Sequence, residues 1–529
     1  MPTVSKTRSF STVFLIEMWE RFGYYGMQAL IIYYMVQRLG FQDTPANLTW
    51  SAAAALIYVS PAIGGWVGDK FFGSRHTMLL GAFVLAIGYA LMVVPASSAD
   101  FLFVALGVIV VGNGLFKANA GNLVRKIYEG DNSKIDSAFT MYYMAVNIGS
   151  TFSMLLTPWI KDYFNAPYAG QMAWLPGAQN LFGDGLGWHI AFAVCCVGLL
   201  VGLGNYLVMR QTLNHIGSEP DHQPFKLWKL LAVLAGGVVV VVLSTIILRY
   251  GAVAKVFVYT AGAAVLVIFG YLIAKCDRHE KPGLVIALIL VIETVFFFIF
   301  YQQMSTSLNL FALRDVDPAF RIFGVHLFNW IPAQFQALNP LWIFVLSPIL
   351  ALTYTHFASR GKDLSIAAKF ALGFFAVGIG FFIYGAAGHF TTAPGKTSQW
   401  VMVGGYGFGS LGELLTSGLG LAFIARYVPA RMGGFMMGAY FVASGVAQYL
   451  GGIVASFASI PDTITDPVQM MPIYTRLYNW LGVAGIACTV VALAVLPLIR
   501  RLDKAHATYA GYANVPDAAK GVPTAGSER

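Results

Sequence analysis

The stretch TVFLIEMWERFGYYGMQALIIYYMVQ, residues 12–37, determines the fold class of this sequence. An α-helix rises about 1.5 Å per residue and needs about 20 residues to cross the hydrocarbon core of a membrane, so this stretch can span one. It also carries charged and polar residues on one helix face, at positions i, i+3, i+4, i+7 and i+11: Glu17, Glu20, Arg21, Tyr24 and Gln28. Charges inside a membrane are costly and normally face a cavity or a partner. The stretch therefore predicts a transmembrane helix with a functional face.

The composition of the whole chain points in the same direction. Hydrophobic residues make up 57% of the sequence and charged residues 11%, whereas a soluble domain carries roughly 25% charged residues. A β-barrel would show alternating segments of about 10 residues instead of long apolar runs. The sequence therefore predicts an all-α polytopic membrane protein.

Apolar runs of similar length recur through the chain. About fourteen spans are predicted, at residues 12–37, 48–68, 77–95, 101–124, 137–160, 187–209, 228–248, 255–275, 283–310, 340–356, 366–387, 399–426, 432–456 and 477–499. Because the number is even, both termini are expected on the same side of the membrane. Most Lys and Arg residues fall in the segments on that side, which is typical of cytoplasmic segments. Both termini are therefore placed in the cytoplasm, and the net charge of +9 reflects topology and not nucleic-acid binding.

The spans divide into two groups separated by a polar linker. Spans 228–248 and 255–275 carry ionisable residues only at their edges, as expected for helices that face lipid. Transporters are commonly built from two related halves. The predicted organisation is a cytoplasmic N-terminus 1–11, a six-helix bundle 12–210, a linker 211–282 with two extra transmembrane helices, a six-helix bundle 283–500, and a cytoplasmic, disordered tail 501–529.

Six ionisable residues lie well inside predicted spans: Glu17, Glu20, Arg21, Lys117, Glu293 and Glu413. Glu20 is expected about 12 Å from the inner membrane surface and Lys117 about 10 Å, at 1.5 Å per residue. This matching depth allows Lys117 to pair with the carboxylates of the first span. A carboxylate that shares a lysine with a neighbouring carboxylate suits a proton carrier. Glu413 is expected near the middle of the membrane, where transporter sites lie.

Several motifs carry a resemblance to a known family. EMWERFGYYG, residues 17–26, resembles the signature ExxERFxYYG of the proton-dependent oligopeptide transporter family, and YYMAVNIGS, residues 142–150, resembles its signature FYxxINxGS. GGWVGD, residues 64–69, is similar to the loop between spans two and three of major facilitator proteins. Within the family, NGLFKAN, TSLN and FQALNP, which begin at residues 113, 306 and 335, look most like segments of bacterial dipeptide and tripeptide permeases. The resemblance covers residues 8–502 and implies the major facilitator fold, with two six-helix bundles plus two extra helices.

The resemblance also implies where a peptide would bind. Its carboxylate would meet two cations and three tyrosines: Arg21, Lys117, Tyr24, Tyr25 and Tyr58. Its amine would meet an acid and two amides: Glu413, Asn147 and Asn339. A zwitterion needs a cation at one end and an anion at the other, with charge-assisted hydrogen bonds to both. Cargo side chains are expected to contact the three tyrosines together with Phe300 and Trp400.

Roles in proton coupling and gating follow from the same resemblance. Glu17 and Glu20 would exchange the coupling proton and release Lys117 when protonated. Glu293 is expected either to share the coupling role or to be a structural partner. Asp69 and Arg75, in the facilitator loop, are expected to act in gating. Many family members carry an arginine at the position of Gln28 and an acid near Tyr301 and Gln302, which together form an outer ion pair. Both charges are absent here, so the gate at Gln28 is expected to be uncharged.

The function implied is that of a proton-coupled symporter importing di- and tripeptides by alternating access. The alternative is a symporter of the same fold for another small zwitterion, an amino acid or a drug. An enzyme is not expected, because none of the nine histidines forms an i, i+4 ligand pair and no metal motif is present. The expected cofactors are none beyond protons, and the expected partners are peptides, protons and the lipid bilayer. The protein is expected to be a monomer in the bacterial inner membrane.

Overall fold

The computed structural model describes residues 5–95, 98–165, 185–360, 364–416 and 420–513. A helix is present at each predicted span. The first group contains α1 (Lys6–Tyr33), α2 (Asp43–Trp66), α3 (Ser74–Val93), α4 (Ala99–Ile127), α5 (Asn132–Asn165) and α7 (Leu186–Met209). Two helices follow the linker, α8 (Leu227–Arg249) and α9 (Gly251–Lys275). The last group contains α10 (Lys281–Gln302), α11 (Ser307–Asp315), α12 (Leu338–Ser359), α13 (Ile366–Gly385), α14 (Gln399–Thr416), α15 (Gly420–Tyr427), α16 (Ala430–Ala455) and α17 (Pro467–Ala513).

The hydropathy of these helices agrees with a multi-pass membrane protein. Among the described residues, 11 helical segments are long and apolar enough to cross a membrane. The helix α1 is not among them, because its middle carries Glu17, Glu20 and Arg21. The charged face singled out in the sequence is therefore also what lowers the hydropathy of the first helix.

The structure differs from the sequence prediction around predicted span 283–310. There α10 ends at Gln302, a short 3-10 turn follows at Gln303–Ser305, and α11 begins at Ser307. Two small hairpins lie beyond these helices and leave the fold class unchanged: β1 (Ala319–Ile322) with β2 (Val325–Asn329), and β3 (Thr391–Ala393) with β4 (Lys396–Thr397). The first hairpin turns at Phe323 and Gly324, which both have positive φ, as tight hairpin turns require.

The prediction of a disordered tail at 501–529 is wrong in its first part. The helix α17 continues to Ala513, and only residues 514–529 lie outside the described residues. A helix of 47 residues is long enough to cross a membrane and to continue well beyond its surface.

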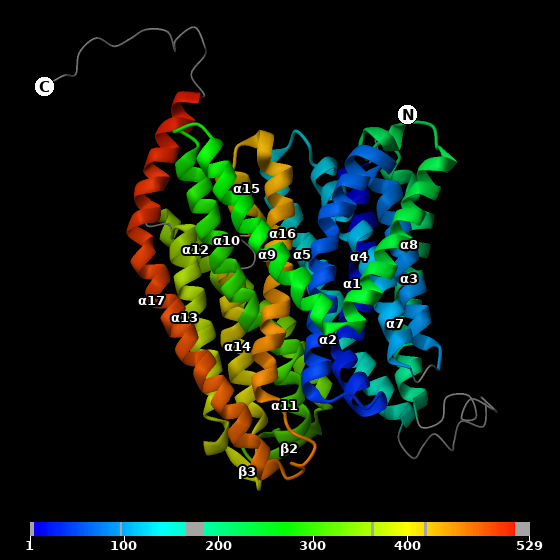
Figure 1. The fold of residues 1–529 in the computed structure, drawn as a ribbon, viewed down its shortest axis with the longest axis vertical. Helices are drawn as coiled ribbons and strands as arrows, with labels where there is room; N and C mark the ends of the chain where they lie inside the picture. Colours follow the sequence, from blue (N-terminus) through cyan, green and yellow to red (C-terminus); the bar gives the residue numbers. More distant parts are fainter. Residues whose placement is uncertain (1–4, 96–97, 166–184, 361–363, 417–419, 514–529) are drawn as a thin grey trace, which may run out of the picture.

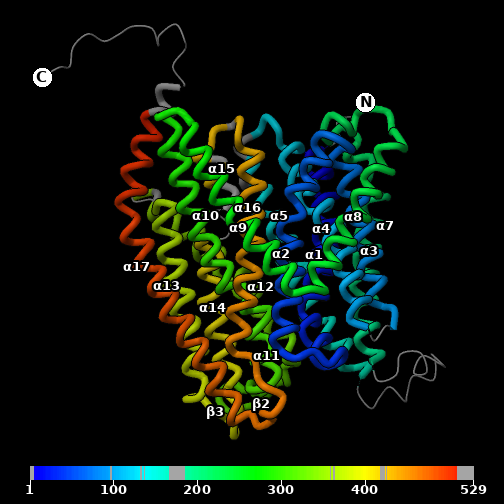
Figure 2. Tube along the Cα trace, viewed as in Figure 1, coloured from blue at the N-terminus to red at the C-terminus, as the bar shows by residue number. Residues whose placement is uncertain are grey.

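The two groups of helices lie side by side, as Figure 1 shows from α1–α7 in blue and cyan to α12–α17 in yellow and red. The chain passes from one group to the other through α8 and α9 (Figure 2). The helix α8 packs against α4 and α9 packs against α16, so this pair contacts both groups. Most of its residues are exposed, since only Val233, Ser244 and Leu248 of α8 are buried. This exposure agrees with the prediction that the two extra helices face lipid.

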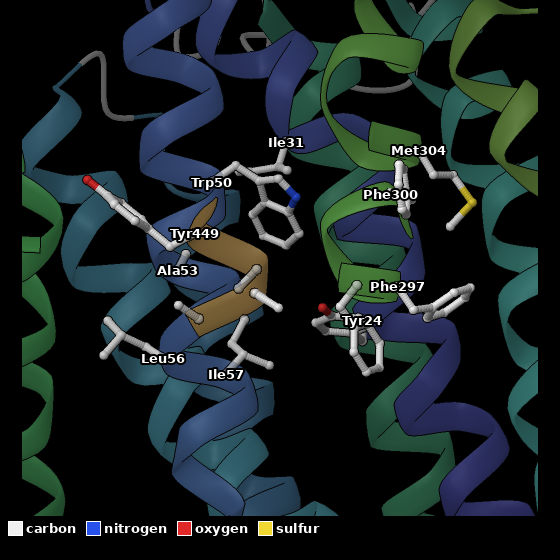
Figure 3. Close-up of a cluster of buried hydrophobic side chains, with 14 of the residues drawn as sticks. Tyr24, Ile31, Trp50, Ala53, Leu56, Ile57, Phe297, Phe300, Met304 and Tyr449 are labelled. Atoms are coloured by element: carbon white, nitrogen blue, oxygen red, sulfur yellow. The ribbon is translucent and has the colours of Figure 1, made fainter. Parts of the chain in front are cut away.

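Glycines allow the close helix contacts within the first bundle. A Cβ on Gly64 of α2 would overlap the carbonyl group of Gly114 on α4, and a Cβ on Gly149 of α5 would overlap the carbonyl oxygen of Met18 on α1. Both glycines belong to motifs that carried the family resemblance, so these motifs have a packing role. Between the bundles, buried side chains from α1 and α2 belong to the same hydrophobic cluster as Phe297, Phe300 and Met304 of the second bundle (Figure 3).

Candidate transport site

The charged face of α1 is fully buried. Glu17, Glu20 and Arg21 are 2%, 0% and 3% exposed. The guanidinium of Arg21 donates two hydrogen bonds to Glu20, one of them 2.6 Å from Nη2 to Oε1, and its Nε lies 3.5 Å from Glu17 Oε1. Glu17 Oε2 accepts no hydrogen bond from the described residues. Arg21 is therefore shared by two carboxylates, and one carboxylate oxygen remains unused.

Lys117 lies near this group but is not paired with it. Within the described chain, no carboxylate oxygen lies within 4.0 Å of its ammonium, which instead sits 5.0 Å above the ring centre of Tyr58. The prediction that Lys117 pairs with the acids of α1 is thus not met in this conformation. Lys117 still lies within electrostatic range of Arg21, Glu17 and Glu20, so it can respond to a change in their charge.

Glu413 is the acidic group of the second bundle, on α14, and it is 7% exposed. Asn339 of α12 donates a hydrogen bond of 2.7 Å to Glu413 Oε2, and Tyr143 of α5 donates one of 3.2 Å to Oε1. Asn339 also contacts Ser410 at 3.1 Å, one turn before Glu413. The structure therefore brings Asn339 and Glu413 together as predicted.

The amide of Asn147 donates to the backbone carbonyl of Tyr143 at 2.8 Å, on the same helix. A role of Asn147 in binding the peptide amine stays a prediction. The tyrosine one turn earlier makes the contact with Glu413. No role was expected for Tyr143 from the sequence, although it is the second tyrosine of the motif YYMAVNIGS. The spacing of four residues from Asn147 places both on one helix face and could have indicated it.

Tyrosines occupy the space between the two charged groups. Tyr25 lies within electrostatic range of both Arg21 and Glu413, and Tyr301 of α10 lies within range of Glu413 and Tyr25. A cavity with about 300 Å³ of empty space lies here, between the bundles. It is lined by Tyr24, Tyr25, Gln28, Trp50, Ala54, Tyr58, Tyr301, Gln302, Ser305 and Gln448. The structure thus brings the three predicted tyrosines and Gln28 to one cavity.

A second, mainly apolar cavity of about 440 Å³ extends from Tyr301 into the second bundle. It is lined by aromatic side chains and glycines of α10, α13 and α14, and it includes Asn339 and Ser410 beside Glu413. Phe300 lines this cavity, as expected for a residue that contacts the cargo. The prediction for Trp400 is wrong. Trp400 is 47% exposed, and its indole bonds the carbonyl of Arg321 at 3.0 Å in the β1–β2 hairpin.

Glu293 lies apart from both charged groups. It is on α10, and Cys488 of α17 is the ionisable neighbour within its electrostatic range. Its Oε2 is buried without a hydrogen-bond partner among the described residues. The structure does not bring Glu293 to the α1 acids or to Glu413, so a coupling role for Glu293 stays a prediction.

The bundles are held together at the end away from the chain termini, the lower end in Figure 1. Hydrogen bonds cross the interface there between Ala29 and Gln336, Tyr33 and Asn309, Gln42 and Asp462, Thr44 and Ser459, Trp50 and Ser305, Ser51 and Gln302, and Leu155 and Gln334. Towards the other end, the described chain adds only the Tyr143–Glu413 contact at mid-depth. Among the described residues, the hydrogen bonds between the bundles are therefore concentrated at the end away from the termini.

A charged pair strengthens the contact between the bundles at this end. Arg314 of α11 donates to both carboxylate oxygens of Asp43 on α2, at 2.5 and 2.7 Å, and to Tyr474 Oη at 2.9 Å. Asp43 also accepts from the backbone N–H of Ile460 at 2.9 Å. No charged side chain lines the cavity beside Gln28, and a gating role for Gln28 stays a prediction. The Asp43–Arg314 ion pair, at another position, was not anticipated from the sequence.

Asp69 and Arg75 flank the junction between α2 and α3, on the side of the termini: Asp69 lies in the π-helical turn Val67–Phe72 and Arg75 in the first turn of α3. Asp69 accepts a hydrogen bond of 2.8 Å from Asn122 of α4. Arg75 donates a hydrogen bond of 2.8 Å to the backbone carbonyl of Leu213 in the linker. Asp221 of the linker binds the same junction through the backbone N–H of Arg75 at 3.1 Å and the ring of His76 at 2.9 Å. Burial tends to raise the pKa of Asp221, but the hydrogen bonds from His76, Arg75 and Ser218 outweigh it and lower that pKa. A gating role for Asp69 and Arg75 stays a prediction.

Two helix bundles that enclose buried charges of opposite sign, with hydrogen bonds between them concentrated at one end, have the arrangement of a membrane transporter. Residues 75–476 match the model of the POT family, and the chain belongs to this family. The dipeptide and tripeptide permease B of Salmonella typhimurium is 40% identical over 499 residues, which cover 94% of this chain and 96% of the permease. The permease B of Edwardsiella piscicida is 41% identical over 496 residues, 94% of this chain and 96% of that one.

Solved structures of peptide transporters have the same fold as this chain. The structure of tetrameric PepTSo2 matches with a TM-score of 0.84 and 64% identity over 94% of this chain and all, 100%, of that chain. A peptide transporter in complex with alafosfalin matches with a TM-score of 0.73 and 27% identity over 93% of this chain and 95% of that chain. The family resemblance and the fold class predicted from the motifs are confirmed.

Proposed function

We propose that this chain is a proton-coupled symporter that imports di- and tripeptides by alternating access. The observation that carries this proposal is that Arg21 of the first bundle and Glu413 of the second are both buried, with Tyr25 within electrostatic range of each. Lys117 lies within range of Arg21. A short peptide has a carboxylate at one end and an ammonium at the other, and charge-assisted hydrogen bonds are its strongest polar contacts. Tyr25 and Tyr301 lie between the charged groups, where the peptide backbone would pass.

Proton coupling follows from the sharing of Arg21. Its guanidinium already serves Glu20 and, more distantly, Glu17. A peptide carboxylate that binds Arg21 displaces at least one of these acids, which would leave a buried charge without a partner, at a cost of several kcal/mol. A proton on the displaced glutamate removes that charge. Peptide and proton therefore bind together more readily than either binds alone.

The end at which hydrogen bonds join the two bundles indicates which side of the membrane this conformation opens to. Basic residues are concentrated on the side of the termini, as expected for cytoplasmic segments. We place both termini in the cytoplasm of a bacterium, with the chain in its inner membrane, so that this conformation opens inward. Import then requires a second conformation in which the Asp43–Arg314 contact opens and the termini side closes, as in alternating access by movement of one bundle against the other.

A single chain supplies every residue of the site, so we propose that one monomer transports. The structural relative PepTSo2 forms tetramers, and in such an assembly each copy would keep its own cavity. The cavity of about 440 Å³ beside Asn339 would receive the side chain of the residue that carries the amine. Its aromatic lining favours apolar side chains of varied size, because such surfaces bind by area more than by specific hydrogen bonds.

Counterflow in proteoliposomes tests whether the protein binds a peptide through its free amine. Labelled dipeptide should be displaced by unlabelled dipeptide, and by its N-acetylated form about tenfold less well, because acetylation removes the charge that Glu413 binds. The Glu413→Gln variant should reduce this difference. Equal displacement by both peptides in the wild type would rule out an amine-binding site at Glu413. Displacement by a single amino acid as strong as by the dipeptide would favour the alternative, a transporter of smaller zwitterions.

A further inference from the structure

A second buried carboxylate lies at the closed end of the second bundle, outside the proposed peptide site. Asp315 ends α11, directly before the β1–β2 hairpin at the lower end of Figure 1. It is 0% exposed, and neither of its carboxylate oxygens has a hydrogen-bond partner in the described part of the chain. A buried acceptor without a partner costs about 1–3 kcal/mol and more when charged, so these oxygens call for an occupant.

The cations around Asp315 are engaged elsewhere. Arg314, the preceding residue, is held by Asp43 and Tyr474. Lys396 of β4 donates to the backbone carbonyl of Arg314. Both lie within electrostatic range of Asp315, but in the described structure no cationic nitrogen comes within 4.0 Å of its oxygens. The remaining ionisable neighbours, Tyr474 and Tyr478, come from α17.

Tyrosines lead from Asp315 towards the peptide site. Tyr478 lies within electrostatic range of both Asp315 and Tyr406. The hydroxyl of Tyr406 is buried without a partner among the described residues, and its ring lines the apolar cavity. That cavity also contains Asn339, which holds Glu413 at 2.7 Å. Tyr478 thus lies near both Asp315 and Tyr406, and water in the cavity would bridge the last step from Tyr406 to Glu413.

The residues around Asp315 favour a proton and a water molecule, and not a metal ion, as the partners of its carboxylate oxygens. A metal ion is a poor fit, because among the described residues no three His, Cys, Asp or Glu side chains gather to hold one, and two cations lie close by. A proton on one oxygen and a water molecule on the other would occupy both oxygens, and buried waters typically make about three hydrogen bonds to such groups. Chains of carboxylates and hydroxyls are also the usual proton relays of membrane transporters.

We propose that Asp315 binds a proton from the solution on the far side and passes it, through water and the hydroxyls of Tyr478 and Tyr406, to Glu413. The O–H bond on Asp315 breaks as water accepts the proton, each hydroxyl accepts one proton and donates its own, and the last proton ends on the Glu413 carboxylate. No electrons move. This branch is separate from Glu17 and Glu20, and it rests on the proposed proton-coupled function.

The test counts protons taken up per peptide in proteoliposomes that contain a pH-sensitive dye. Asp315→Asn removes the proton site with little change in shape, and Tyr478→Phe removes one hydroxyl of the relay. Asp317→Asn is the matched control, because Asp317 lies two residues further on and is bound by Arg321 and Thr392 in the hairpin. We expect both relay variants to retain most of the counterflow activity but to lose about tenfold in gradient-driven accumulation, with fewer protons per peptide. The control should match the wild type.

An unchanged proton count in Asp315→Asn overturns the inference. If that variant does not fold, Tyr478→Phe decides, since loss of protons per peptide supports the relay and a wild-type count contradicts it. A wild-type protein without any gradient-driven uptake would instead overturn the proposed function itself.

Discussion

Tyr143 of the first bundle donates a hydrogen bond of 3.2 Å to Glu413 of the second. Among the described residues, the other hydrogen bonds between the bundles lie closer to the end away from the termini. Both Tyr143 and Glu413 lie beside the predicted amine site. It therefore joins peptide recognition to the relative position of the two bundles.

Loss of this contact should weaken peptide binding. A typical hydrogen bond contributes about 0.5–1.5 kcal/mol, and one to a charged group about 1.5–3 kcal/mol. We therefore expect Tyr143→Phe to weaken dipeptide binding by roughly tenfold, measured by calorimetry in detergent. Tyr163→Phe is the control, because this tyrosine is 52% exposed on the same helix. Equal losses in the two variants would show that the effect does not come from Glu413.

The acids of α1 should differ in their effects. Glu20 accepts two hydrogen bonds from Arg21, whereas Glu17 lies at 3.5 Å and keeps one oxygen unused. We expect Glu17→Gln and Glu20→Gln each to abolish pH-driven accumulation while exchange continues in part. Glu20→Gln should also weaken peptide binding more, because it changes the position of Arg21. Uphill uptake at the wild-type rate in either variant would refute its proton role.

The ion pair of Asp43 and Arg314 should control the outer closure. Breaking a buried pair by changing one partner typically costs about 3–5 kcal/mol. Asp43→Asn should therefore increase the population of the outward-open state. The measurement is labelling of a cysteine introduced at Ser305 by a membrane-impermeant thiol reagent added outside, in a background without the four native cysteines. Asp462→Asn is the control, because its contact with Gln42 is exposed. Labelling that stays at the control level would show that other contacts hold the closure.

Much of this arrangement could be predicted from the sequence. The burial and helical spacing of Glu17, Glu20 and Arg21 follow from a local period, and the motifs located Asn339 and Glu413. Asp43 and Arg314 could not be paired in this way, because 271 residues separate them and both fall between predicted spans. The break between α10 and α11 was also missed. Residues 301–309, YQQMSTSLN, are mostly polar there, but composition does not report backbone angles.

The linker clamp on the α2–α3 junction should stabilise the protein in a pH-dependent way. The pKa of Asp221 is lowered in the folded state from its usual value of 3.8. Its contribution to stability is therefore complete above that value and is lost as the pH falls through the folded-state pKa. We expect Asp221→Asn to lower the Tm at pH 7 by a few degrees, with a smaller difference from wild type below about pH 3. A difference that is constant from pH 7 to pH 3 would exclude the ionised carboxylate as the cause.

In the proposed function, a proton gradient drives peptide uptake through this chain. The direct measurement is uptake of a labelled dipeptide into proteoliposomes, with and without an imposed inward proton gradient. We expect peptide to accumulate above the external concentration only with the gradient, and an added protonophore to abolish the accumulation. Folded protein that equilibrates the peptide to the same level in both conditions would contradict the proposed function.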